Sequence, residues 1–169
     1  MEGAGLTVRP ASGKTLTLDV PVGGEGGFVL AGEGTVAFGA GRYGFSGPLT
    51  VQAGVVDLSS AGVVTNAVLA AGAGTILGGD FRGVEIRLGG VDGPVPHFRD
   101  VAFSGRSYLS VAGVSGDCDD VKVATYEGSL SLRGSFRIKG QDGYRAVLTA
   151  RDGEIHASIG QFGFRVLVR

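Results

Sequence analysis

The sequence contains one cysteine, few charged residues and no long apolar run, and each absence excludes a class of protein. Cys118 stands alone, so no intrachain disulfide can form. Glycine, aspartate or arginine interrupts every apolar stretch before it reaches the ~18 residues that a membrane helix needs. Basic residues number 15 and acidic residues 16, so the chain as a whole has no electrostatic attraction to nucleic acid. The beginning, residues 1–5, lacks the basic and apolar regions of a signal peptide, which predicts a cytosolic protein or a piece of a longer chain.

Helix signals are also scarce, because glycine occupies 33 of the 169 positions. Each interior glycine costs a helix ~1 kcal/mol relative to alanine. Short runs in which apolar and polar residues alternate take the place of helical patterns. They cover residues 15–22, 49–52, 84–88, 136–139, 155–159 and 162–169. The chain is too apolar for disorder and long enough for one domain, so we expect an all-β domain whose strands each bury one face.

A repeat of 20 residues is visible in the first half. One track places Leu16 and Leu18 in register with Val36 and Phe38, and these with Val56 and Leu58. A second track consists of Val29, Leu49 and Leu69. Glycine columns accompany both tracks, at positions 32 and 72 and at positions 34, 54 and 74.

This period predicts a parallel β-solenoid of about 20 residues per coil, with glycines at corners that need positive φ. The coils are expected over residues 1–120, most clearly over 15–80. Residues 121–169 are expected to form a cap of longer strands in the same domain, with hairpin turns at 141–143 and 151–153. The alternative is a β-sandwich in which the spacing is accidental.

Three segments carry a family resemblance: residues 18–28, with a glycine-rich turn, 32–38, with Gly34-Thr35-Val36, and 43–58, in which Thr50-Val51 and Gly54 precede Leu58. They resemble the autotransporter-associated β-strand repeat, and residues 123–155 are similar to the segment that closes such arrays. Phe45-Ser46 and Pro48 depart from the family pattern. The resemblance implies a right-handed parallel β-helix in the passenger region of a large exported surface protein, without catalytic residues. The chain would then be a fragment from near the C-terminal end of the solenoid.

The densest acidic cluster offers the best metal candidates, Asp117, Asp119 and Asp120. Carboxylates suit Ca²⁺, but no Asp-x-Asp-x-Asp-Gly loop with a distant glutamate follows. The same cluster beside Lys122 could also serve a β-helical polysaccharide lyase, whose acidic and basic groups must converge on one face. We favour a solvated turn, and we expect no metal site and no cofactor.

Other candidates have simpler interpretations. His97 is expected at an exposed corner and His156 on the polar side of a strand, too far apart in sequence to suggest a metal pair. Cys118 lies between acidic residues, which disfavour a nucleophilic thiolate at this position. Six aromatic residues could line a carbohydrate-binding face, although an interior position is favoured: Tyr43, Phe45, Phe81, Phe98, Phe103 and Tyr108. The basic strands around 133–139, with Arg145, Arg165 and Arg169, give the C-terminal third a positive charge that an acidic polymer could use.

These observations predict a non-catalytic structural or stalk segment of a secreted or cell-surface, outer-membrane-associated protein, with its flanking domains as partners. The alternative is a module that binds glycans or another surface polymer on one solenoid face. An enzyme comes third, and self-association through parallel strand edges is a further option. No nucleic-acid partner and no membrane insertion by this segment are expected.

Overall fold

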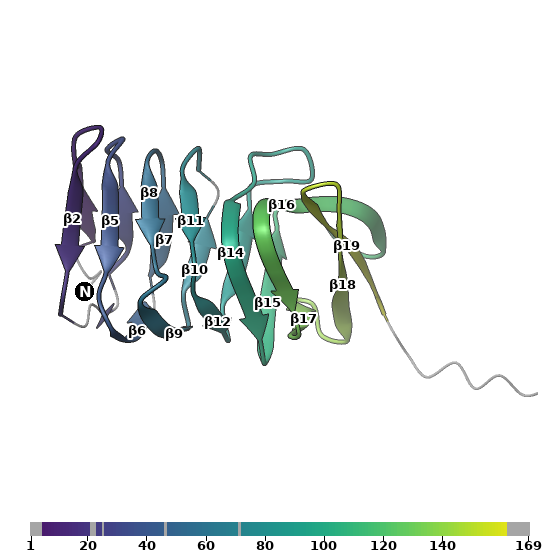
Figure 1. The fold of residues 1–169 in the computed structure, drawn as a ribbon. Coiled ribbons are helices and arrows are strands. Elements are labelled where there is room, and N and C mark those ends of the chain that lie inside the picture. The colour runs from purple at the N-terminus through teal and green to yellow at the C-terminus, as the bar shows by residue number, and fades with distance from the viewer. Residues whose placement is uncertain (1–4, 21–22, 25, 46, 71, 162–169) are drawn as a thin grey trace, which may run out of the picture.

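The computed structural model describes residues 5–20, 23–24, 26–45, 47–70 and 72–161. These residues form strands and turns and contain no helix, so none that could cross a membrane. Most strands pair in parallel with the equivalent strand about 20 residues further along the chain. Figure 1 shows the result as an elongated molecule whose strands lie side by side in chain order.

The parallel strands form three ladders. The first ladder consists of β1 (Leu6–Val8), β4 (Phe28–Leu30), β7 (Pro48–Val51), β10 (Val68–Ala70), β13 (Glu85–Leu88), β15 (Arg106–Val111) and β17 (Ser135–Ile138). The second consists of β2 (Thr15–Leu18), β5 (Thr35–Phe38), β8 (Val55–Asp57), β11 (Thr75–Leu77), β14 (His97–Ser104) and β16 (Cys118–Leu132). The third consists of β3 (Gly23–Gly24), β6 (Gly41–Phe45), β9 (Ala61–Thr65), β12 (Asp80–Arg82) and the second halves of β14 and β16.

The strands β14 and β16 each pass from the second ladder to the third through a bend. Asp100 in β14 and Gly128 in β16 both have positive φ at this bend. The Asp100 carboxylate accepts hydrogen bonds from the backbone N–H of Ser129, at 2.8 Å, and from its hydroxyl, at 3.0 Å. Because these bonds favour the charged form, they lower the pKa of Asp100. The two strands therefore bend at neighbouring positions, and the Asp100 carboxylate links the two bends.

Apolar side chains from equivalent positions stack in the interior. Val36, Val56 and Ile76 are neighbours in register and are at most 1% exposed. Leu16 is in register with Val36, as the first track predicts, but is 40% exposed because β2 has a described neighbour on one side only. The second track is wrong by one residue in its first layer. Leu49 lies opposite the buried Phe28, and a one-residue shift places Val29 on the other face.

The last two described strands pair antiparallel with their neighbours. Strand β18 (Tyr144–Arg151) pairs with β17 on one side and with β19 (Glu154–Gln161) on the other, and β19 also pairs with β16. The turns at 141–143 and 151–153 connect these strands, so the two predicted hairpins are confirmed. Ile155, Ala157 and Ile159 of β19 are buried as predicted. The alternating run expected at 162–169 lies outside the described residues.

Candidate functional site

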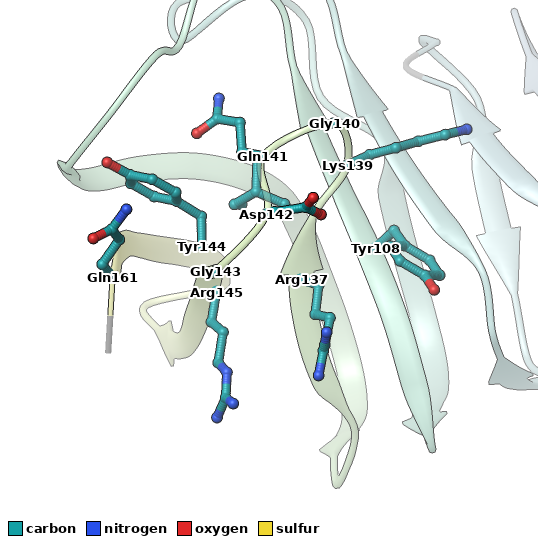
Figure 2. Close-up of a pocket in the computed structure, with 11 residues that line it drawn as sticks. Tyr108, Arg137, Lys139, Gly140, Gln141, Asp142, Gly143, Tyr144, Arg145 and Gln161 are labelled. Atoms are coloured by element: carbon teal, nitrogen blue, oxygen red, sulfur yellow. The ribbon is translucent and has the colours of Figure 1, made fainter. Parts of the chain in front are cut away.

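A groove of about 680 Å³ lies over β15 and the β17–β18 hairpin (Figure 2). It combines cationic, aromatic and amide side chains. Its lining consists of Tyr108, residues 137–145 and Gln161. Asp117, Asp119 and Asp120 are not among the lining residues.

Strand register places four side chains of this region in one row across the sheet. Glu85 lies opposite Tyr108, Tyr108 opposite Arg137, and Arg137 opposite Arg145. Their strand neighbours Ile86, Leu109 and Ile138 are buried, so alternation directs the row away from the core. The row therefore follows from four strands that are distant in sequence but adjacent in the sheet.

The turn that closes the hairpin is held by hydrogen bonds and by glycine conformation. Gly140 and Gly143 have φ values of 77° and 83°, which other residues rarely adopt. The side-chain amide of Gln141 donates to the carbonyl oxygen of Val114 at 2.6 Å, which ties the turn to the preceding loop. Tyr144 and Gln161 lie on one side of the turn in Figure 2, and Tyr108 and Arg137 on the other.

The charges of the groove are unevenly compensated. Lys139 extends away from the hairpin in Figure 2 and pairs with Glu85 of β13. Arg137 and Arg145 are exposed, lie directly opposite each other and have no ion-pair partner in the part of the chain that the structure describes. Asp142 is the one carboxylate in the groove lining. The local potential is thus positive around the two arginines.

Glu85 lies on the outward face of its strand, as the alternation predicts, but its side chain is only 6% exposed. It is covered by cations: Arg87 Nε donates to it at 3.0 Å, and Lys139 Nζ donates to its other oxygen. Burial alone would raise the pKa of Glu85, but the hydrogen bonds from Arg87 and Lys139 outweigh it and lower the pKa.

Replacing Glu85 with glutamine should lower the free energy of unfolding by about 1–2 kcal/mol at neutral pH, since two charge-assisted hydrogen bonds are weakened. The folded pKa of Glu85 is lowered, so its contribution is complete above the unfolded value and declines as the pH falls below about 4.5. Urea unfolding at pH 7 and pH 3 measures both effects. Asp142→Asn is the matched control, because Asp142 is exposed. An equal loss for E85Q at both pH values would contradict this account.

The three carboxylates of the predicted acidic cluster do not converge on a common position. Asp117 and Asp119 are exposed, whereas the Asp120 carboxylate pairs with Arg151 and lies 3.0 Å from His156 Nδ1. Among the described residues, no three His, Cys, Asp or Glu side chains are placed to hold a metal ion. The cluster therefore contributes to an ion-pair network and carries no metal proposal.

This network continues along β19. His156 Nε2 lies 3.0 Å from Glu154, whose other oxygen accepts from Lys122 Nζ at 3.0 Å. The hydrogen bond from Lys122, followed by that from His156, lowers the pKa of Glu154. The side chain of His156 is 13% exposed, between two carboxylates. It lies on the polar side of its strand, as predicted, where it bridges β16 and β19 and is largely covered.

His97 is also less exposed than predicted. It begins β14 rather than occupying a corner, and its Nδ1 lies 2.9 Å from the Thr125 hydroxyl. Four of the six aromatic candidates for a carbohydrate face are interior: Tyr43, Phe81, Phe98 and Phe103 are at most 1% exposed. Tyr108 is 37% exposed, and the side chain of Phe45 lies outside the described part. A binding face built from those six aromatics is therefore excluded.

Comparison with known proteins leaves this chain without an assigned family. No protein-family model matches it, and no curated protein matches it. The resemblance to the autotransporter-associated repeat accordingly remains a prediction. The groove must be interpreted from its own residues.

The sequence contained a partial signal for this groove. The basic residues around 133–139 and Arg145 were visible as a positive region, and Tyr108 was among the aromatic candidates. Their juxtaposition was not visible, because it depends on the pairing of β15 with β17 and of β17 with β18.

Proposed function

We propose that this chain is a non-catalytic, rod-forming segment of an exported cell-surface protein. In this proposal the three ladders are the sheets of a right-handed parallel β-helix, and β18 with β19 caps its C-terminal end. The in-register stacking of equivalent strands is the observation that carries it: Thr15, Thr35, Val55 and Thr75 are successive neighbours at steps of 20 residues. Such stacking makes a stiff structure that lengthens by repetition.

Location and partners follow from the family resemblance. The rod would hold flanking domains of a larger surface protein at a fixed separation. The ion pair between Asp120 and Arg151 agrees with a structural role for this member of the acidic cluster. Protease treatment of intact cells that produce the protein tests the surface location, because an internal protein would be protected.

Removal of residues 55–74 should yield a folded, shorter protein. This deletion joins Gly54 to Thr75, which takes the place of Val55 on Thr35 and keeps every later strand in register. Spin labels at the exposed Thr17 and Thr149, in a Cys118→Ser background, should come closer by roughly one strand spacing, about 4.8 Å.

The matched control removes residues 65–74, which is half of the step. This deletion joins Val64 to Thr75 and puts Gly78, Gly79 and Asp80 in the place of strand β10, so we expect no cooperative unfolding transition. An unchanged label distance after the 55–74 deletion, or loss of folding in both variants, would contradict the β-helical rod.

A further inference from the structure

We propose that the groove over β15 and the β17–β18 hairpin binds an acidic polysaccharide. Arg137 and Arg145 would hold a carboxylate or sulfate group, and Tyr108 would pack against the adjacent sugar ring. This site is independent of the rod role, because a rod needs no ligand. It assigns named residues to the alternative function, the binding of glycans or another surface polymer.

The arginine pair is the first argument. Like charges directly opposite each other in neighbouring strands are destabilising. Arg137 and Arg145 have this relation, and no carboxylate of the described residues pairs with either. Their side chains extend in the same direction from the hairpin in Figure 2. Two guanidinium groups so placed can donate hydrogen bonds to the oxygens of a carboxylate or sulfate group, whose negative charge would offset the repulsion.

Tyr108 is the second argument. It is the neighbour of Arg137 on the side away from Arg145, and its side chain is 37% exposed in a sheet whose other large rings are mostly interior. An exposed tyrosine offers a flat apolar face and a hydroxyl. A pyranose ring has a matching C–H face and hydroxyl groups. The row formed by Tyr108, Arg137 and Arg145 therefore spans two strand spacings, roughly 10 Å.

The shape and charge of the groove favour a polysaccharide over other anions. The row runs across the strands through an open groove of about 680 Å³, which suits an extended chain better than a lone ion. Nucleic acid is disfavoured, since its binding depends mainly on many basic side chains that neutralise phosphates. The groove offers two uncompensated arginines, beside a lysine engaged by Glu85.

Affinity electrophoresis tests the proposal on the full chain, with polygalacturonate as a carboxylated probe, dextran sulfate as a sulfated probe and dextran as a neutral one. At least one acidic probe should retard the protein while dextran should not. Which acidic probe is the stronger identifies the anionic group. Arg137→Ala and Arg145→Ala should each weaken binding about tenfold, equivalent to about 1.4 kcal/mol. Tyr108→Ala should weaken it as well.

Arg9→Ala is the matched control, because Arg9 is exposed and follows β1, the first strand of the first ladder. It removes the same charge and should change binding less than twofold. Thermal unfolding of the R137A and R145A variants should occur at or above the wild-type temperature, since repulsion is relieved. Equal retardation by dextran, an equal loss for R9A, or equal affinity for a single-stranded oligonucleotide would overturn the proposal. So would the absence of retardation by both acidic probes.

Discussion

Replacement of Gly72 by alanine will destabilise the protein by about 3 kcal/mol or more, within the range of severe backbone clashes. A Cβ atom at this position would overlap the carbonyl oxygen of Val51 and lie 2.6 Å from its carbonyl carbon. Val51 belongs to β7, and its carbonyl oxygen also accepts the backbone N–H of Gly74 at 3.0 Å. No side-chain rotation can relieve the overlap, so neighbouring ladder strands must separate.

Gly89→Ala provides the matched control for this prediction. A Cβ atom at Gly89 meets nothing within 4 Å, and its φ is not in the left-handed region. This variant should be neutral or more stable by up to about 1 kcal/mol, because alanine restricts the unfolded chain. Urea unfolding followed by circular dichroism measures both. Similar stabilities for G72A and G89A would show that the layers are less closely packed than described.

Replacement of Phe103 by alanine should cost about 3–5 kcal/mol, the usual range for a fully buried phenylalanine. Its ring lies 5.4 Å from that of Phe81, 5.3 Å from Phe98 and 5.9 Å from Phe136, measured between centroids. Phe136 belongs to β17, which begins the terminal hairpins. The cavity would therefore loosen the contact between the parallel ladders and the antiparallel end.

Two further variants make this prediction specific. Phe103→Leu should lose less than F103A, because part of the cavity stays filled. Val147→Ala removes a side chain that is 52% exposed and should change stability by no more than about 0.5 kcal/mol. Chemical unfolding monitored by circular dichroism separates the three. A loss for F103A no larger than that for V147A would contradict a packed aromatic cluster.

The glycine columns show what a sequence pattern can and cannot explain. The predicted period was correct, but the predicted need for positive φ at these positions was mostly wrong. Of the five column glycines, only Gly54 has positive φ. The others are needed because a Cβ would meet the neighbouring layer, such as the Pro10 backbone at Gly32. Spacing in the sequence reveals a repeated requirement, whereas the distance between layers is set only when the strands pair.

The Phe28 register shows a similar limit. Both Phe28 and Val29 are apolar, so the pattern alone gave no reason to prefer one as the inward residue. The step from Phe28 to Leu49 is 21 residues rather than 20, because the intervening turns absorb one more residue. Turn lengths vary without cost to the ladders, and small departures from the period are therefore invisible in a single sequence.

Local sequence patterns were enough to predict the all-β class, the 20-residue step, the C-terminal hairpins and most inward-facing residues. These properties depend on alternation and on glycine placement, both of which can be seen in consecutive residues. Strand pairing was needed to reveal that Glu85 is buried beneath Lys139, 54 residues away, and that Arg137 lies between Tyr108 and Arg145. Such neighbours belong to different strands, so their proximity arises from pairing and not from any pattern along the chain.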